Sequence, residues 1–316
     1  MGPLLTSFES EPINAPKESV TESAVIHKFI QDVVPTTTPE KYLRKQALLA
    51  EDRPTVAGAL LYSDEPQALM PKRCGVKIYR YKTTAPEGFR AALAFTPKTV
   101  EGCIYNQIKD SVRITTETVE SIPRMGEGAL EKISYPPEAI HEIIANALIH
   151  RDYSMPDDVH ITVFDNRIEI KSPGRLPAHI TVKNILDERA PRNGAVVRLL
   201  NKFPDPPNQD VGEGLNTAFA AMTKLGLKEP VIIEKENSVV VIIKHEPLAS
   251  PEESIMDYLS SHSTVNNKKA REITYIGQDY RVKTIFGKMV EKHLIEQVPG
   301  TRTAATCYRK YTGKKS

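Results

Sequence analysis

The sequence predicts an α+β fold in which helices cover one face of a mixed β-sheet. The stretch 159–171 alternates apolar and polar residues around a tight turn, and the stretch 231–244 has two apolar-rich runs around Glu236 and Asn237, which predicts two β-hairpins. The stretch 135–153, YPPEAIHEIIANALIHRDY, repeats its apolar residues at helical spacing. Further helical patterns lie between the two hairpins. This order of helix, hairpin, helices and hairpin is typical of a two-layer domain.

The first hundred residues carry weaker signals. Residues 1–50 are rich in Pro, Thr, Ser and Glu, so we expect a partly ordered lead-in with only short helices. The predicted elements are, in chain order, helices at 24–33 and 39–50, strands at 54–62 and 74–82, and a helix at 100–117. The stretch 63–73 between the two strands is rich in turn-forming residues.

The helix at 135–153 carries the most informative pattern in the chain. Pro136 and Pro137 suit its first turn, where a backbone N–H has no partner within the helix. Glu142, Asn146 and His150 are each four residues apart and share a face separate from the apolar one. A carboxylate one turn from a carboxamide can hold a hydrated magnesium ion and a water beside a nucleotide. A solvated polar stripe would show the same spacing, so the neighbouring segments must decide between the two.

The other elements of the middle region follow this helix. In chain order they are strands at 159–164 and 167–171, short helices at 181–187 and 193–203, a helix at 214–225, and strands at 231–235 and 238–244. SPGRLP at 172–177 is expected to break the second strand, and PDPPNQ at 204–209 is expected to form a loop. Gly226 is the expected C-cap of the preceding helix.

Two glycine-bearing segments indicate where a ligand would lie. The segment SPG at 172–174 ends a strand, and backbone without a side chain can approach a flat ligand closely. Gly212 and Gly214 open a helix, whose N-terminal N–H groups and dipole favour an anion such as phosphate. This is not a dinucleotide fingerprint, because a loop precedes it and Thr217 stands where a third glycine belongs.

Taken together and in this order, the motifs resemble a known family. EAIHEIIANALIHRDYS, VFDNRIEIKSPGRLP, APRN and GEGLN are similar to ATP-binding proteins of the GHKL type, and more narrowly to the family labelled RecG-related or Schlafen-AlbA-associated transcriptional regulators. The resemblance covers roughly residues 54–243. It implies a Bergerat-type ATP pocket in a sandwich of mixed sheet and helices. It also implies a partial Schlafen-AlbA-like segment before that pocket, since the chain begins too late to hold a whole such domain.

The resemblance assigns roles to particular residues. Glu142 would be the catalytic residue that polarises water, and Asn146 would bind magnesium. Gly174 would lie near adenine, and Gly212 and Gly214 would lie at the phosphates. The cofactors implied are therefore ATP and Mg²⁺.

The same comparison marks departures from the family pattern. Ser172 stands where GHKL proteins typically carry an aspartate for the adenine amino group, which predicts looser selection of the base. Arg189 and Arg192 lie in the expected lid, where they could meet phosphates, although a solvated loop is the default interpretation of such residues. The C-terminal YTGKKS lacks the first glycine and the Ser/Thr of a phosphate-binding loop, so a Walker-type helicase is not expected. Nucleotide binding is therefore expected, with slow ATP hydrolysis at most.

The C-terminal region is strongly basic. Residues 262–316 hold twelve basic residues against four acidic ones, which suggests a module that meets a polyanion. Helices are predicted at 252–261, 266–273 and 278–293, followed by a hairpin of strands at 294–298 and 304–308. The residues of the third helix expected to face inward are Val282, Ile285, Phe286, Met289 and Val290.

Three helices and a basic hairpin predict a winged helix-turn-helix. The expected contacts with phosphates of double-stranded DNA are Arg281, Lys283 and Lys288 on the third helix and Arg302 and Arg309 on the wing. The alternative is a winged helix that binds a protein, with a solvated basic face.

The composition indicates the class of protein and the cellular environment to expect. It is 40% hydrophobic and 26% charged, as expected for a globular protein without a membrane span. The N-terminus lacks the pattern of a secretory signal. Cys74, Cys103 and Cys307 are too far apart for a disulfide framework or a zinc site, so a reduced, cytoplasmic setting is expected.

The expected domains are a lead-in with the partial Schlafen-AlbA-like segment at 1–100, a GHKL-like ATP-binding domain at 101–247 and a winged helix at 248–316. The predicted function is a DNA-binding regulator in which Mg-ATP controls conformation or pairing, and a homodimer would double the DNA contact. Two alternatives remain open. One is an ATPase subunit of a DNA-processing or defence system, and the other is a winged-helix repressor with a vestigial ATP fold.

Overall fold

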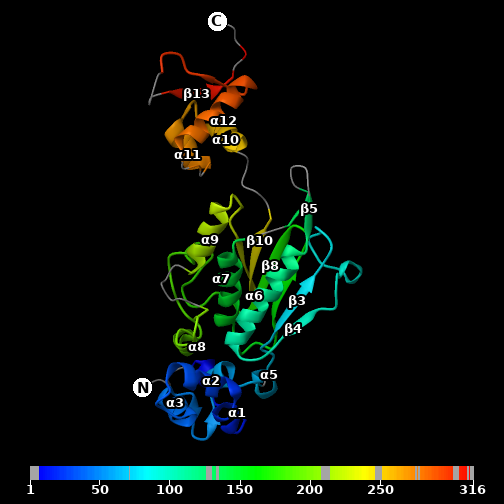
Figure 1. The fold of residues 1–316 in the computed structure, drawn as a ribbon, viewed down its shortest axis with the longest axis vertical. Helices are drawn as coiled ribbons and strands as arrows, with labels where there is room; N and C mark the ends of the chain where they lie inside the picture. Colours follow the sequence, from blue (N-terminus) through cyan, green and yellow to red (C-terminus); the bar gives the residue numbers. More distant parts are fainter. Residues whose placement is uncertain are drawn as a thin grey trace. The chain divides into compact units, whose positions relative to one another are not determined.

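The computed structural model describes residues 7–70, 72–125, 130–132, 135–207, 214–245, 251–274, 276, 278–301, 306–311 and 313 (Figure 1). The chain divides into two units. The first comprises Met1–Leu225 and Glu229–His245, and the second comprises Gly226–Lys228 and Glu246–Ser316.

A mixed six-stranded sheet organises the first unit. Its strands lie in the order β4-β3-β7-β8-β10-β9. β3 and β7 are parallel, and the other neighbouring pairs are antiparallel. The strands are β3 (Val76–Arg80), β4 (Lys98–Val100), β7 (Val159–Val163), β8 (Arg167–Pro173), β9 (Val231–Lys235) and β10 (Ser238–Lys244). The structure therefore confirms the predicted α+β class with a mixed sheet, and both predicted hairpins form.

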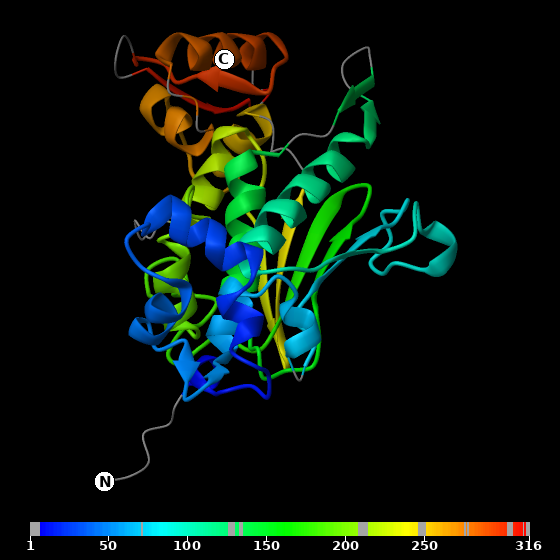
Figure 2. The same cartoon turned by 60° about the horizontal axis from the view of Figure 1, so that its bottom comes forward.

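Three helices lie along one face of this sheet (Figures 1 and 2). α6 (Ile104–Glu120) packs on β3 and β7, α7 (Pro137–Ile149) packs on β8, and α9 (Gly214–Lys224) packs against α7. Every second residue of β3 and β7 is buried, as a half-covered strand requires. α7 begins at the predicted proline and ends at Ile149, where the backbone N–H of His150 still bonds the carbonyl of Asn146.

Residues 7–70 form a packed cluster of short helices, so the expectation of a partly ordered lead-in was wrong. The elements are η1 (Phe8–Ser10), α1 (Glu18–Thr21), α2 (Ala24–Val33), α3 (Pro39–Lys45), the strands β1 (Leu49–Ala50) and β2 (Arg53–Pro54), α4 (Val56–Tyr62) and α5 (Pro66–Leu69). The rings of Phe29, Tyr42, Tyr62 and Phe203 pack together at the centre of this cluster. Four large rings contribute enough buried apolar area to order a short, polar-rich sequence.

The predicted strand at 54–62 is instead the helix α4. The hydroxyl of Thr55 accepts a hydrogen bond from the N–H of Gly58 and caps its N-terminus. All seven residues of α4 are buried, so the sequence shows a continuous apolar run without helical periodicity. A Cβ on Gly58 would lie 2.6 Å from the carbonyl oxygen of Leu48, so the glycine permits this close packing.

The predicted helix at 181–187 is a series of turns. The side-chain oxygen of Asn184 accepts hydrogen bonds from both the N–H and the hydroxyl of Thr181. These bonds resemble the capping pattern of a helix start, but the backbone that follows forms only turns. The predicted helix at 193–203 is shortened to α8 (Gly194–Leu200), and β8 runs on through Pro173 into the segment expected to break it.

Smaller elements complete the first unit. They are η2 (Arg90–Ala92), β5 (Pro123–Met125) and β6 (Leu130–Lys132), the last two paired as a hairpin.

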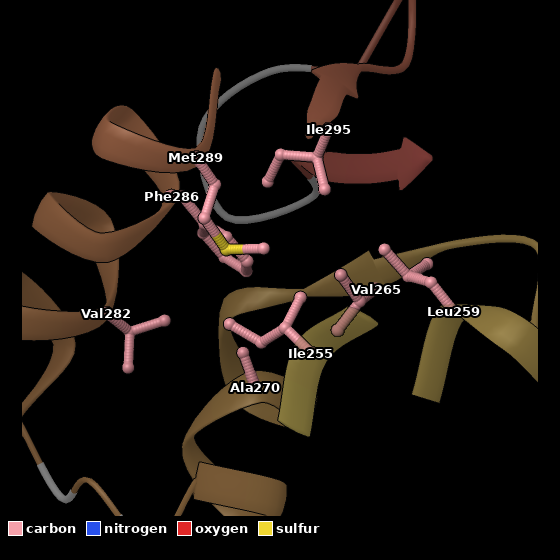
Figure 3. Packing of buried hydrophobic residues seen from close by; sticks show 8 residues of the cluster. All are labelled: Ile255, Leu259, Val265, Ala270, Val282, Phe286, Met289 and Ile295. Carbon is pink, nitrogen blue, oxygen red and sulfur yellow. The ribbon is translucent and has the colours of Figure 1, made fainter. Parts of the chain in front are cut away.

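The second unit holds three helices and a three-stranded antiparallel sheet in the order β11-β13-β12. The elements are α10 (Pro251–Ser261), β11 (Val265–Asn266), α11 (Asn267–Thr274), α12 (Asp279–Glu291), β12 (Ile295–Gln297) and β13 (Cys307–Lys310). Figure 3 shows how side chains from all three helices, β11 and β12 meet in one core. Val282, Phe286 and Met289 are fully buried there as predicted, whereas Val290 is 38% exposed and does not face inward.

Within the described residues, no helix combines the length and the apolar character needed to span a bilayer.

Candidate functional site

A cavity of about 260 Å³ lies in the first unit between α7, the strands β8, β9 and β10, the segment after β8, and the start of α9. Its wall contains most of the predicted site residues, namely Glu142, Asn146, His150, Ser172, Gly174, Arg189 and Gly214. Aliphatic side chains form the remainder, among them Ile170, Ile180, Leu186 and Val241. The cavity thus combines an apolar floor with a few polar groups, as small-molecule sites do. Gly212 lies outside the described residues.

Glu142 and Asn146 meet one turn apart on α7, as their spacing predicted. The amide nitrogen Nδ2 of Asn146 donates a hydrogen bond to Oε1 of Glu142 at 2.6 Å. Burial raises the pKa of Glu142, an effect that the Asn146 hydrogen bond and the nearby His141 oppose. A Cβ on Gly214 would lie 2.0 Å from the same carboxylate oxygen, so only glycine lets α9 begin this close to Glu142.

The end of β8 is fastened to the end of α7. The hydroxyl of Ser172 donates a hydrogen bond to the carbonyl of Ala147 at 2.7 Å. The N–H of Asp152 bonds the carbonyl of Pro173 at 2.8 Å. These two contacts hold one corner of the cavity in a fixed geometry.

Gly174 occupies this corner in a conformation that favours glycine. Its φ is +101°, and an added Cβ would lie only 2.6 Å from the Cβ of Asp152. The backbone of Gly174 therefore passes directly against the segment after α7, and it lines the cavity without a side chain.

An ion pair between Arg192 and Asp152 lies at the same corner of the cavity. Nη1 of Arg192 lies 3.0 Å from Oδ2 of Asp152, and Nη2 of Arg192 donates to the carbonyl of Arg175 at 2.6 Å. Arg192, predicted as a phosphate contact, is thus held by protein groups and is not among the residues that line the cavity. Burial, reinforced by the positive charge of Arg192, lowers the pKa of His150 from 6.5 to about 4. The cavity wall therefore presents a neutral imidazole at neutral pH.

Two supporting residues, Asn193 and Glu9, were missed by the sequence analysis. The amide of Asn193 donates to the carbonyls of Ile149 and Arg151, which satisfies the C-terminal end of α7. The buried carboxylate of Glu9 accepts hydrogen bonds from the N–H groups of Ala195 and Val196 at the start of α8.

Arg151 follows α7 and belongs to the HRD triplet at 150–152, whose charged residues next to an apolar helix suggest either a helix-end contact or a role supporting the site. It is fully buried, and its Nη2 donates to the carbonyls of Arg73, Met155 and Asp157. Asn193 and Glu9, in contrast, bond partners more than 40 residues away, for which the sequence gives no local signal.

No three His, Cys, Asp or Glu side chains converge on a common point within the described residues. Glu142 and Asn146, which are joined by a hydrogen bond, both line the cavity and carry oxygen atoms that could meet a hydrated cation.

The residues predicted to contact DNA lie in the second unit. Arg281 and Lys288 are exposed and are separated by two turns of α12, so they share one side of the helix. Lys283 points elsewhere on the helix and pairs with Asp279 at 2.5 Å. Arg309 on β13 pairs with Glu296 on β12 at 2.7 Å. Arg302 lies outside the described residues.

Comparison with known proteins supports part of this picture. Residues 157–243 match the family model described as "Putative ATP-dependent DNA helicase recG C-terminal", which supports an ATP-binding, RecG-related domain. The match includes Ser172, Gly174 and Gly214 but begins after Glu142 and Asn146. No curated protein matches the chain.

A solved structure has a similar fold. It is that of the DIP2311 protein from Corynebacterium diphtheriae, with a TM-score of 0.57 and 17% sequence identity. The similarity covers 96% of this chain but 64% of the other, so the chain spans about two thirds of the length of that protein. At this identity the likeness extends to the fold alone.

Proposed function

We propose that this protein is an ATP-binding, DNA-binding regulator whose nucleotide occupies the cavity beside α7. The observation that carries the proposal is the Glu142–Asn146 pair, which faces the cavity where α9 begins at Gly214. A helix N-terminus favours the negative charge of a phosphate, and a carboxylate with a carboxamide suits a hydrated cation. The RecG-related match of residues 157–243 supports the same ligand class.

The donor set fits magnesium. Mg²⁺ keeps several waters and needs only one or two protein oxygens in addition to phosphate oxygens. Because Nδ2 of Asn146 is directed to Glu142, its carbonyl oxygen Oδ1 is the atom left to meet a hydrated cation. When bound, the ion would neutralise phosphate charge; the residues that would hold it are Asn146 and, through water, Glu142.

Hydrolysis is expected to be slow. A general base must be ionised to accept a proton from water, but burial of Glu142 favours its neutral form. The hydrogen bond from Asn146 favours the ionised carboxylate but does not fully offset the effect of burial on the pKa of Glu142. We therefore infer that ATP serves mainly to change conformation or pairing of the chain, with slow turnover.

The base-binding end of the cavity is expected to be permissive. Ser172 donates its proton to Ala147, so its oxygen can accept a hydrogen bond from a base but carries no charge. Adenine would lie beside Gly174, with the neutral ring of His150 in the same wall.

The second unit is proposed as a winged helix that binds double-stranded DNA. Three helices with a small antiparallel sheet support this interpretation, as does the basic charge of residues 262–316. α12 would enter the major groove, with Arg281 and Lys288 on phosphates. A homodimer would place two such units on one duplex and strengthen binding through linkage.

Calorimetric titration of Mg-ATP into the whole chain tests the nucleotide site. We expect the wild type to bind, and Asn146→Ala to bind at least tenfold more weakly while its thermal unfolding remains cooperative. Asn216→Ala provides a matched control, because Asn216 also lines the cavity but bonds the carbonyl of Leu186. Absence of binding to the wild type would leave a winged-helix repressor with a vestigial ATP fold. ATP turnover only with a protein partner, without duplex affinity, would favour an ATPase subunit.

A further inference from the structure

The sheet of the first unit has a second face, turned away from α6 and α7 and from the viewer in Figure 1. Strand alternation places every second residue on it. The pairing of β3 with β7 and of β7 with β8 determines which residues lie side by side across the strands. Lys77, His160 and Lys171 form one such row, and Tyr79, Thr162 and Glu169 form the next. Val76, Ile78 and Arg80, which alternate with these residues on β3, are buried on the helix side, whereas Lys77, Tyr79 and Tyr81 are partly exposed.

Aromatic rings run continuously across this face. Tyr79 and His160 are stacked with centroids 5.8 Å apart, and Tyr79 and Tyr81 are nearly parallel, with centroids 6.3 Å apart and 7° between the planes. Tyr81 in turn stacks with Phe164, whose other neighbour is the guanidinium of Arg167 at 3.7 Å. We define these four rings, His160, Tyr79, Tyr81 and Phe164, as the aromatic row.

The two ends of the aromatic row differ. Phe164 is 3% exposed, and Tyr81 is covered by the backbone of Gly88, where an added Cβ would lie 2.4 Å from the Tyr81 ring. The Tyr79 and His160 end is more open, and 25% of the His160 side chain is exposed. The row therefore runs from a buried ring, Phe164, to a partly exposed ring, His160.

Cationic groups flank the open end. Lys77 lies beside His160 in the cross-strand row and bonds the hydroxyl of Thr99 at 2.5 Å. Lys171 lies on the other side of His160 and pairs with Asp157, which also accepts from the His160 ring. Since Asp157 is already shared between these two groups, the open end presents rings between two lysines and little uncompensated negative charge.

We propose that this face binds single-stranded nucleic acid, with a base stacked against the open end of the aromatic row, where His160 rests on Tyr79, and the phosphate backbone along Lys77 and Lys171. Every base offers a flat face for stacking, so aromatic side chains on a sheet between lysines form a sequence-tolerant platform. A duplex hides its base faces and cannot use such a surface. This site is separate from the cavity beside α7 and from the second unit, and it does not depend on the function proposed for either.

The absence of tryptophan from the sequence gives a direct reporter. In the full-length chain, Tyr79→Trp introduces a single indole whose fluorescence a stacked base would quench. We expect a 20-nucleotide deoxythymidine oligomer at low salt to quench it saturably, and duplex DNA of the same length not to. The same oligomer made as uridine RNA distinguishes the two single-stranded sources. The control is Val182→Trp, which places the indole on an exposed residue that belongs neither to the aromatic row nor to α12.

Fluorescence anisotropy with a labelled oligomer separates stacking from other contacts. Tyr79→Ala should weaken binding about tenfold, while Tyr79→Phe, which keeps the ring, should bind as the wild type does. Circular dichroism must show both variants folded. The proposal is overturned if the wild type does not bind single strands, if Tyr79→Ala binds equally well, or if Phe and Ala are equally impaired. It is also overturned if Arg281→Ala removes single-strand binding, since that would locate the site on α12.

Discussion

Oε1 of Glu9 accepts a hydrogen bond from the backbone N–H of Ala195 at 3.0 Å, although the two residues stand 186 positions apart in the sequence. The second oxygen of the carboxylate accepts from the next N–H, that of Val196, at 3.1 Å. Glu9 thereby caps α8, which directly follows the wall segment of the cavity that contains Arg189. These two hydrogen bonds therefore link the start of the described chain to the helix that follows the cavity wall.

Removal of this cap should destabilise the first unit. Glu9→Ala leaves two N–H groups at the start of α8 without acceptors, which typically costs about 1–2 kcal/mol in the free energy of unfolding. Urea denaturation followed by circular dichroism measures the change. Glu11→Ala is the matched control, because Glu11 is exposed and should change stability by less than about 0.5 kcal/mol. Equal losses in the two variants would contradict a capping role for Glu9.

Gly174 should tolerate alanine less well than a glycine with the same backbone conformation. Its φ of +101° is nearly that of Gly102, at +99°. An alanine Cβ at 174 would lie 2.6 Å from the Cβ of Asp152, whereas at 102 the nearest atom is 3.9 Å away. We expect Gly102→Ala to cost about 1 kcal/mol from backbone strain alone and Gly174→Ala to cost about 3 kcal/mol or more. Similar unfolding midpoints in urea would show that the corner at Asp152 can relax.

Acid should destabilise the protein in part through His150. In the folded chain its pKa is lowered from 6.5 to about 4, so the unfolded state binds the proton more tightly. The resulting stability is present above pH 6.5 and is lost as the pH falls towards 4. His150→Gln, which cannot be protonated in this range, should lose less stability than the wild type, by about 3 kcal/mol at most.

Urea denaturation of the wild type and of His150→Gln at pH 7.5, 6, 5 and 4.5 gives the difference between their free energies of unfolding. Glu142 is present in both proteins, so its own titration does not contribute to this difference. A difference that stays constant with pH would show that His150 titrates normally in the folded chain.

Duplex binding should depend on Arg281 more than on Lys283. Both are exposed cations on α12, but Lys283 pairs with Asp279 and lies away from the side shared by Arg281 and Lys288. Arg281→Ala should weaken binding to duplex DNA severalfold and reduce the slope of log K against log salt by about one. Lys283→Ala should change neither by much. Anisotropy over a range of salt concentrations tests this, and a larger effect of Lys283→Ala would place the DNA on another side of α12.

The local sequence pattern was sufficient to predict the helix and the hairpins that line the cavity. The α7 helix and the first hairpin have a regular apolar periodicity, and both hairpins have turn residues of their own, so their type and approximate bounds could be predicted. Contact between Glu142 and Asn146 follows from their spacing on one helix. The position of Gly174 at a strand end followed from the break in the β8 pattern.

Elements buried on all sides and contacts between distant segments could not be predicted. α4 has no polar face, so its sequence carries no helical period. The pairing of Arg192 with Asp152 and the bonds of Asn193 to the end of α7 join segments about 40 residues apart, as the fold brings them together. No local sequence signal specifies such partners.

The parallel pairing of β3 with β7 bears on how the first unit folds. Val76 is in register with Val159, and the chain between them includes β4, α6 and α7. The centre of the sheet can therefore be completed only after a long loop has closed, and non-local parallel pairing of this kind is slow. The matched segment 157–243 contains β7, β8, β9 and β10 but none of the chain that forms β3, α6 or α7. The segment of recognisable sequence similarity therefore lacks one of the two central strands of this pairing, and newly synthesised β3 keeps one edge unpaired until β7 has been made.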